Sequence, residues 1–362
     1  MSAIETEQAA DTERAIDISV IVPVRNEASV LRETAASMLA QSFDGELELL
    51  FVDGCSEDGS LEILAELAEQ DSRVRVLENP KQIEPAALNI GVGGARGTYV
   101  ALLNAHCWFP QDYLARGVER LKRGDVSWVT GPAIPRGRDR FSRGVALALV
   151  SPLGAGGSKK WASADAPAAP EVELDTGLFA GVVRRDTLRS LGPFQEGWLV
   201  NHDSEMAARV IGSKGRIVML SAMGAYYHPR NTPAGLWRQY WRFGRYRVKT
   251  AQLHPLALRP FHLLSAGLAA SPIVAVAAPR PLRRFARATL ATYALTLAAA
   301  STVTVRGEQE RDPGTLATVF AVMHLGWGAG FLSGCLRWGP PWKGIAHAVG
   351  FRRDVEELTD RP

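Results

Sequence analysis

The sequence predicts an α/β domain built on a parallel sheet, followed by a helical region that associates with a membrane. Short apolar, β-branched runs such as ISVIVPV at 18–24, separated by segments with helical spacing of apolar residues, predict the first part. Such unbroken runs are typical of strands buried on both faces, and strands that alternate with helices form right-handed βαβ units. Three long uncharged stretches after Arg259 predict the second part.

Strands and helices alternate from residue 18 onward. The expected elements are a strand at 18–24, a helix at 28–42, a strand at 47–52, a helix at 61–67, a strand at 74–77, a helix and turn at 85–94 and a strand at 99–103. Residues 137–174, rich in Gly, Ala, Ser and Pro, are expected to be irregular. In parallel sheets ligands bind beyond the carboxyl ends of the strands, where polar residues also stand in this sequence. No GxGxxG motif follows the first strand and no GxxxxGK[ST] motif occurs, so a dinucleotide site and a P-loop have no sequence support.

The composition excludes several protein classes. Hydrophobic residues make up 46% and charged residues 22% of the 362 residues, so most of the chain can bury a core. Cys55, Cys107 and Cys335 are far apart and form no CxxC, which argues against a disulfide scaffold or a zinc site. Residues 1–17 carry five acids and one base, unlike a secretory signal, and are expected to form a disordered tail.

The charge is distributed very unevenly. From Met206 to Gly307 there are 15 Lys and Arg and no Asp or Glu, although the net charge is only +3. Such a stretch suits either nucleic acid or a membrane surface with anionic lipid. The uncharged segments within and after it favour the membrane, so no nucleic-acid partner is expected.

The uncharged segments cover 260–279, 288–305 and 313–336. Each is long enough to cross a bilayer, with a buried helical domain as the alternative. The loop at 280–287 carries four Arg, and three spans would place it outside the cell, against the positive-inside rule. We therefore expect 288–305 and 313–336 to be transmembrane, and 260–279, interrupted by Pro272, to be re-entrant or interfacial.

Several spaced motifs resemble those of family 2 glycosyltransferases of the GT-A fold, over about residues 18–253. Two of them are ISVIVPVRNEASVLRETAASMLAQ, which begins at Ile18, and ELLFVDGCSEDGS, which begins at Glu48. Three further segments resemble bacterial exopolysaccharide glucosyltransferases of the succinoglycan type: SPLGAGGSKKW at 151–161, NHDSEMAAR at 201–209 and YYHPRNTPAGLWRQYWRFGRYR at 226–247.

The resemblance implies how the chain is organised. It implies a Rossmann-like GT-A domain at 18–253 that binds a nucleotide-sugar, with an interfacial helix at 234–250. Membrane-associated helices would follow at 254–345 and a cytoplasmic tail at 346–362. The protein would then lie in the inner (cell) membrane with its catalytic domain in the cytoplasm.

The resemblance also implies a donor site and a metal. The residues that match the family's nucleotide-sugar site are Pro23, Val24, Asn26, Glu27, Asp53, Asn89 and Asn104. A divalent cation, Mn²⁺ or Mg²⁺, would stabilise the charge on the diphosphate leaving group, with His106 as its ligand. The subgroup's Asp-Ala-His is Asn104-Ala105-His106 here, so weaker metal binding is expected, and an imidazole favours Mn²⁺. Without the resemblance, capping residues and a histidine satisfied at a strand end would be the preferred explanation of these positions.

Asp203 is the implied catalytic base, which takes the proton of an acceptor hydroxyl. The family's Glu-Asp pair is His202-Asp203 here, and a simple preference for a helix start is the alternative. Gln239-x-x-Arg242-Phe243 resembles the family's QxxRW, and an amphipathic membrane anchor is its alternative. The residues implied to contact the acceptor or a diphosphate are Lys159, Lys160, Thr176, Gly177, Gln239 and Arg242. For the two lysines, a solvated loop is the alternative.

The implied function is that of an inverting glycosyltransferase. It would move a hexose from a nucleotide-sugar, with UDP-glucose expected, to a polyprenyl-diphosphate-linked saccharide in exopolysaccharide or cell-surface polysaccharide synthesis. Because Asn104 and His202 both remove negative charge from the site, a second hypothesis is a catalytically weakened relative that acts as a scaffold in a polysaccharide assembly complex.

Overall fold

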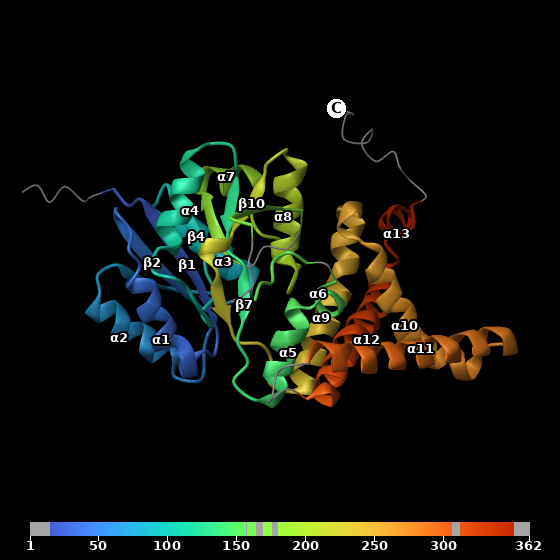
Figure 1. The fold of residues 1–362 in the computed structure, drawn as a ribbon. Helices are drawn as coiled ribbons and strands as arrows, with labels where there is room; N and C mark the ends of the chain where they lie inside the picture. Colours follow the sequence, from blue (N-terminus) through green and yellow to red (C-terminus); the bar gives the residue numbers. More distant parts are fainter. Residues whose placement is uncertain (1–14, 157, 164–168, 176–179, 306–311, 351–362) are drawn as a thin grey trace, which may run out of the picture.

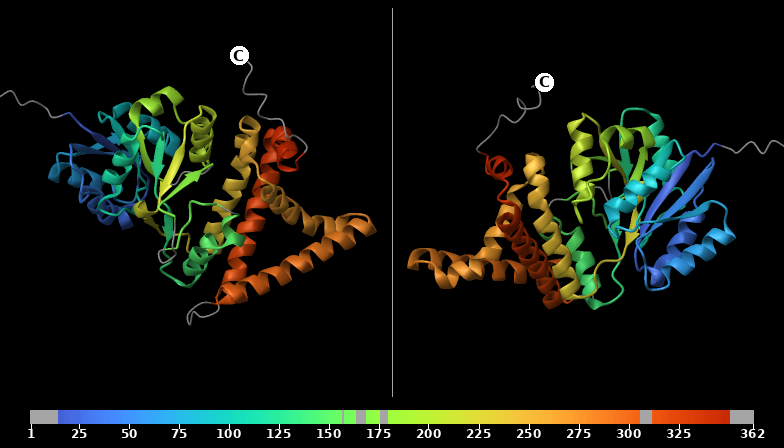
Figure 2. Two further views of the ribbon diagram at one scale, coloured as in Figure 1. Left: turned by 45° about the horizontal axis from the view of Figure 1, so that its top comes forward. Right: turned by 180° about the vertical axis from the view of Figure 1, so that it is seen from behind.

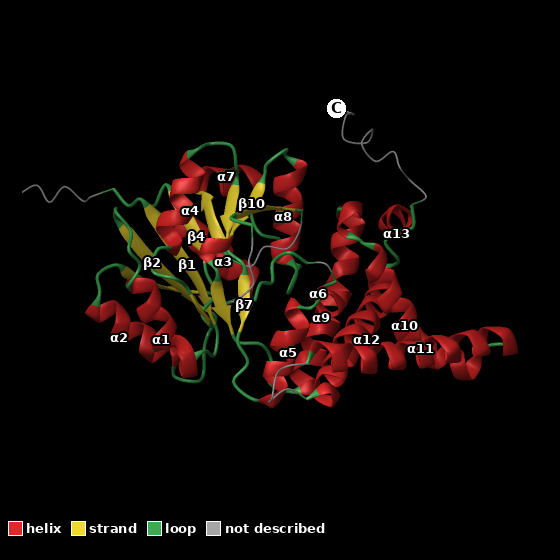
Figure 3. Cartoon of the chain, viewed as in Figure 1, coloured by secondary structure: helices red, strands yellow, loops and turns green. Residues whose placement is uncertain are grey.

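The structure, a computed structural model, describes residues 15–156, 158–163, 169–175, 180–305 and 312–350. Residues 1–14 of the predicted N-terminal tail and 351–362 of the predicted C-terminal tail lie outside this description. Figure 1 shows an α/β domain followed by a helical region, and Figure 3 shows that the strands are confined to the first of these.

Within the described residues, the main sheet has eight strands in the order β3-β2-β1-β4-β9-β6-β10-β8. The strands are β1 (Ile18–Val24), β2 (Leu47–Asp53), β3 (Val74–Glu78), β4 (Tyr99–Leu102), β6 (Trp128–Thr130), β8 (Glu171–Leu174), β9 (Gly181–Arg184) and β10 (Ile217–Leu220). The four strands from β3 to β4 are parallel, as predicted, whereas β9 and β8 are antiparallel to their neighbours. The carboxyl ends of β1, β2 and β4 therefore meet at one edge.

Helices cover both faces of the main sheet. Val20 and Val22 of β1 join the core beneath α1, α2 and α4, and Ile21 joins the core beneath α3, α7 and α8. All three side chains are fully buried, which explains the unbroken apolar run. The helices are α1 (Ala28–Leu39), α2 (Ser60–Gln70), α3 (Glu84–Gly94), α4 (Tyr113–Lys122), α7 (Arg185–Leu191) and α8 (His202–Gly212).

A smaller sheet among the described residues has three strands, in the order β5-β11-β7. They are β5 (Cys107–Trp108), β11 (Ala225–Tyr227) and β7 (Ala133–Pro135). Since β5 follows directly on the segment after β4, this sheet brings the chain around Tyr227 to the carboxyl edge of the main sheet.

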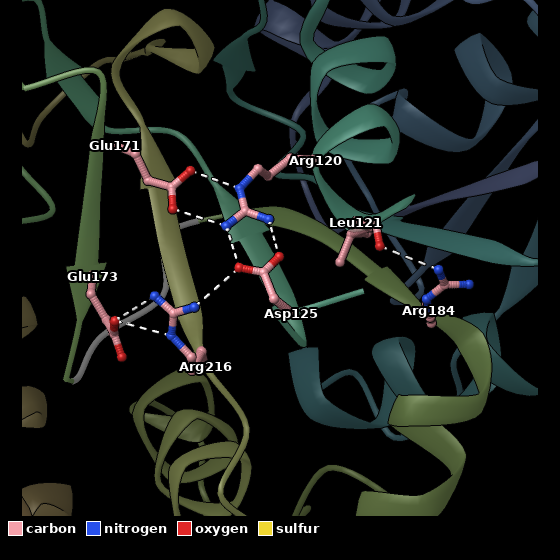
Figure 4. Close-up of polar contacts among 7 residues, drawn as sticks. All are labelled: Arg120, Leu121, Asp125, Glu171, Glu173, Arg184 and Arg216. Carbon is pink, nitrogen blue, oxygen red and sulfur yellow. Dashed lines mark hydrogen bonds and ion pairs between the residues drawn. The ribbon is translucent and has the colours of Figure 1, made fainter. Parts of the chain in front are cut away.

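A network of ion pairs fastens the edge strand β8 to the domain (Figure 4). Arg120 of α4 is 6% exposed and pairs with Asp125 at 2.5 Å and with Glu171 of β8 at 2.7 Å. Arg216 joins Asp125 to Glu173 with contacts of 3.1 and 2.9 Å. The hydrogen bonds of Arg120 lower the pKa of Asp125 to about 2, so the network stays charged at neutral pH.

The expectation of an irregular segment at 137–174 is wrong, because α5 (Arg140–Val150), α6 (Pro152–Ala155) and β8 lie within it. The side chain of Asp139 accepts the Ser142 N–H at 2.9 Å, and Ser142 Oγ accepts the Asp139 N–H, which forms a capping box. Val145 and Leu149 are buried in a cluster with residues of α12, far along the chain. These contacts outweigh the loop-like composition.

The helical region contains α9 (Pro233–Leu253), α10 (Pro260–Ala277), α11 (Arg280–Thr304), α12 (Pro313–Trp338) and α13 (Trp342–Ala348). Figure 2 shows α9 and α12 side by side, while α10 and α11 reach away and meet at their far end. Two described helices, α10 and α12, are long and apolar enough to cross a membrane, and α11 is not among them. The predicted assignment of spanning and interfacial segments therefore stays a prediction.

Glycines bring α9 and α12 into close contact. A Cβ atom on Gly330 of α12 would lie 2.0 Å from the carbonyl oxygen of Trp241, and one on Gly244 of α9 would lie 1.9 Å from that of Trp327. Gly326, Gly330 and Gly334 recur every four residues on α12, the small-residue spacing by which membrane helices pack backbone to backbone. The position of α9 is thus set by α12.

Candidate active site

A cavity of about 650 Å³ lies between the carboxyl edge of the main sheet and α9. It is bounded by the segment after β4, the start of α8, the segment before α9, and one face of α9. The predicted site residues that line it are Glu27, Asn104, His106, Lys160, Asp203, Gln239 and Arg242. Residues from distant parts of the sequence are therefore brought together, as the motifs predict.

Four predicted donor residues lie at the same edge but outside the cavity lining. Pro23 and Val24 end β1, and Val24 pairs with Asp53 across β1 and β2. Asp53 is 3% exposed and accepts hydrogen bonds from the Ser56 N–H at 3.1 Å and the Ser56 hydroxyl at 2.6 Å. Asn26 donates its N–H to Ser56 Oγ at 3.0 Å. These bonds fasten the loops after β1 and β2 to each other, and a role in nucleotide binding stays a prediction.

The remaining predicted residues lie elsewhere. Asn89 bonds the backbone of Phe194, donating to its carbonyl at 2.9 Å and accepting its N–H at 2.7 Å, and Phe194 lines the cavity. Lys159 is exposed, with its Nζ 3.4 Å from the Glu173 carbonyl oxygen. Thr176 and Gly177 lie outside the described residues. Asn89 thus holds a wall of the cavity, and Lys159 turns away from it.

His106 is held by a carboxylate. Its Nδ1 lies 3.1 Å from Oε1 of Glu27, so Nε2 is the ring nitrogen left for another ligand. Histidines that bind metals are commonly oriented in this way. No cluster of three or more His, Cys, Asp or Glu suited to a metal occurs among the described residues. The residues therefore fit a cation held by one imidazole, with its other ligands drawn from a bound substrate and water.

The start of α8 carries the predicted base. Asn201 has a left-handed backbone, with φ of 64°, and its side-chain amide donates to the Phe243 carbonyl at 2.9 Å, which ties α8 to α9. His202 is 7% exposed, and its Nε2 lies 3.5 Å from Oε1 of Glu84. Asp203, the next residue, lines the cavity.

Glu84 and His202 form a carboxylate–imidazole contact that the sequence does not reveal. The His202 side chain is buried, whereas that of Glu84 is 48% exposed. Desolvation favours the neutral form of each group, but their mutual attraction outweighs it. The pKa of His202 is therefore raised and the pKa of Glu84 is lowered. Glu84 begins α3 and lines the cavity, so α3 supplies a carboxylate beside His202.

Cations dominate the opposite wall. Arg230, Arg238 and Arg242 line the cavity, and none of them pairs with an acidic side chain in the part of the chain that the structure describes. Gln239 Nε2 lies 3.5 Å from the Tyr227 hydroxyl. The motifs assign a role to only two residues of this wall, Gln239 and Arg242. The basic and aromatic composition of 226–247 is the signal that could have identified the other two arginines. Such a wall suits a ligand with several negative charges.

Comparison with known proteins identifies the family. Residues 19–169 match the model described as glycosyl transferase family 2. The succinoglycan biosynthesis protein ExoA of Rhizobium meliloti (strain 1021) is 32% identical over 326 residues, which cover 86% of this chain and 93% of that protein.

Two further relatives are more distant. A dolichyl N-acetyl-α-D-glucosaminyl phosphate 3-β-D-2,3-diacetamido-2,3-dideoxy-β-D-glucuronosyltransferase of Methanococcus voltae is 27% identical over 151 residues, which cover 40% of this chain and 47% of that protein. The mannosyltransferase PcManGT of Pyrobaculum calidifontis, solved with GDP-Man and Mn²⁺, is 21% identical, with a TM-score of 0.54 over 86% of this chain and 88% of that one. The fold match confirms the predicted GT-A architecture. The chain belongs to glycosyl transferase family 2 and is a glycosyltransferase.

Proposed function

We propose that this glycosyltransferase moves a hexose, with inversion, from a nucleotide-sugar to a lipid-linked saccharide during synthesis of an exopolysaccharide or cell-surface polysaccharide. One observation carries the proposal: a single cavity is lined by Asp203, His106 and two arginines of α9, Arg238 and Arg242, which pair with no acidic side chain among the described residues. The relatives named for succinoglycan biosynthesis and for a dolichyl-phosphate-linked sugar support the class of product and acceptor. We propose UDP-glucose as donor and a polyprenyl diphosphate as the acceptor's lipid.

Asp203 acts as the general base in this proposal. Its carboxylate takes the proton of the acceptor hydroxyl while that oxygen attacks the anomeric carbon. The bond from that carbon to the diphosphate breaks at the same time, so the configuration inverts and a nucleoside diphosphate leaves. Arg230, Arg238 and Arg242 offset the negative charge that develops on the leaving group.

A divalent cation, Mn²⁺ in preference to Mg²⁺, fits the residues around His106. His106 would hold it through Nε2 together with diphosphate oxygens of the donor, and Glu27 orients the ring. When bound, such an ion stabilises charge on the leaving diphosphate.

The same proposal places the enzyme at the inner membrane with its catalytic domain in the cytoplasm. In this proposal 288–305 and 313–336 cross the membrane. Of these, α12 is long and apolar enough to span by itself, and it positions α9, which lines the cavity. A lipid-linked acceptor would then reach the cavity from the bilayer.

Asp203→Asn tests the proposal. We expect transfer to fall by about 10³-fold, since a positioned base contributes on the order of 10²–10⁴, while the Kd for the donor stays unchanged. Transfer is measured in membranes with a panel of nucleotide-sugars and Mn²⁺, and donor binding with purified protein. Asp186→Asn is the matched control, because Asp186 also stands in the first turn of a helix but is exposed and outside the cavity.

Undiminished transfer by Asp203→Asn would reject this residue as the base. Purified protein that binds no nucleotide-sugar with either cation present would reject the proposed function as a whole.

A further inference from the structure

Two cations near Asp203 are not explained by donor binding. We propose that Lys160 and Arg247 form a second anion site, which binds the phosphate of the lipid-linked acceptor on the membrane side of Asp203. This inference rests on the proposed function. To Lys160, which the resemblance already implies to contact the acceptor or a diphosphate, it adds Arg247, the last residue of the motif at 226–247.

The position of Arg247 follows from the helix face on which it stands. Leu236, Tyr240 and Phe243 of α9 line the cavity, and Arg247 follows Phe243 by one turn on the same face. The hydrogen bond from Asn201 to the Phe243 carbonyl fixes the start of α8 beside this turn. Arg247 itself lies just beyond the cavity lining, and Asp203 is close enough for its negative charge to counteract the lowering of the Arg247 pKa.

Lys160 reaches the same region from another part of the chain. Ala133 of β7 donates its N–H to the Lys160 carbonyl at 2.8 Å and accepts the Ala162 N–H at 3.1 Å. This pairing holds the segment against the smaller sheet, and the Lys160 side chain lines the cavity. Lys160 and Arg247 thus approach Asp203 from separate elements.

The charges in this region do not balance. Burial lowers the pKa of both Lys160 and Arg247, and Asp203 is the carboxylate that counteracts this effect at each. Arg247 Nε is buried without a hydrogen-bond partner, and Arg247 forms no ion pair within the described residues. One carboxylate cannot neutralise two cations, least of all when it accepts a proton during the reaction. Both side chains are partly buried, and Lys160 Nζ also lies 5.3 Å from the centroid of the Trp161 ring. Because two partly buried cations face one carboxylate, an anionic ligand suits this position.

The site lies on the side of the membrane helices. Arg259, which precedes α10, is close enough to Arg247 to lower its pKa further, and it is itself paired with Asp175 at 2.5 Å. Arg230 and Arg238 stand before and near the start of α9, whereas Arg247 stands near its end. A diphosphate donor at the first group and a lipid phosphate at the second would leave Asp203 facing the acceptor hydroxyl between them.

Charge-dependent acceptor recognition tests this inference. Full-length protein in nanodiscs of fixed phosphatidylglycerol content is assayed with two acceptors, a saccharide on a polyprenyl diphosphate and the same saccharide on an uncharged chain of equal length. Arg247→Gln is expected to raise KM for the diphosphate acceptor at least about tenfold, and to leave donor KM and KM for the uncharged acceptor unchanged. Arg247→Lys should recover part of the loss.

Arg245→Gln is the matched control. Arg245 lies two residues before Arg247 in α9, and its guanidinium carbon lies 4.8 Å from the centroid of the Trp241 ring. We expect it to keep the wild-type preference for the diphosphate acceptor. If Arg247→Gln keeps the wild-type preference for the diphosphate acceptor, the inference is overturned and the proposed function stays intact. The same conclusion follows if the variant loses binding to phosphatidylglycerol vesicles while its KM for the acceptor is unchanged. Absence of transfer by the wild type with every donor would instead overturn the proposed function.

Discussion

Asn104 stands in the wall of the cavity, two residues before His106. Its amide brings no charge to a region where His106 would share a cation with the donor's diphosphate. Asn104→Asp should therefore strengthen Mn²⁺ binding, because a nearby carboxylate attracts the ion and is a ligand that Mn²⁺ accepts. We expect the Kd for Mn²⁺ to fall about tenfold, or ~1.4 kcal/mol, in titrations with UDP present.

The control for this change is Asn231→Asp, at an exposed residue outside the cavity lining. Equal Mn²⁺ affinity in wild type and Asn104→Asp would show that the cation does not bind near β4.

Single residues also show what a sequence can and cannot predict about a site. Glu27, His106 and Asp203 were predictable because each belongs to a run of neighbours with a recognisable order. The roles of Glu84 and Arg247 were not predictable. Folding places Glu84 Oε1 3.5 Å from His202 Nε2 and brings Asp203 close enough to Arg247 to affect its pKa, although these residues are far apart in the chain. Contacts between residues distant in the chain leave no local pattern.

Among the elements, α9 and α12 are joined most closely, through backbone contacts at glycine. Gly330→Ala would place a Cβ atom 2.0 Å from the Trp241 carbonyl oxygen, so the helices must move apart. We expect a loss of about 1–3 kcal/mol of stability, the usual cost of overpacking, and lower transfer activity because α9 carries Gln239 and Arg242. Thermal unfolding in nanodiscs measures the first effect and the transfer assay the second.

Gly267→Ala on α10 is the control, because a Cβ atom there meets nothing within 4 Å. It should be neutral or stabilise the helix by up to ~1 kcal/mol. If both variants unfold at the wild-type temperature, the close packing of α9 on α12 is not required for stability.

Elements, like single residues, could be predicted where the signal is local and not where it depends on distant contacts. The strand predicted at 18–24 coincides with β1, because its residues are buried on both faces and leave an unbroken apolar run. The helix α5 was missed, since its apolar face is covered by α12, more than a hundred residues later in the chain. Short antiparallel strands such as β8 and β9 form only by pairing with other strands, and the sequence alone does not show which strands these are.

At the scale of the whole molecule, charge separates the two regions. The acid-free stretch from Met206 to Gly307 covers α9, α10 and α11, and the four Arg at 280–287 fall at the start of α11. By the positive-inside rule we expect this Arg-rich segment and the C-terminus to lie in the cytoplasm and the loop at 306–312 to lie outside. Reporter fusions at the loop and after Pro362 measure the orientation, and an external C-terminus would contradict it.

The glycine contacts between α9 and α12 also link chemistry to the lipid environment. At these contacts no side chain lies between the two backbones, so a shift of α12 is transmitted directly to α9, the helix that carries Arg242. Bilayer thickness changes the tilt of a spanning helix. If α12 spans the bilayer as predicted, sugar transfer should respond to acyl-chain length even when donor and acceptor concentrations are fixed, and the surrounding lipid would then regulate the enzyme mechanically.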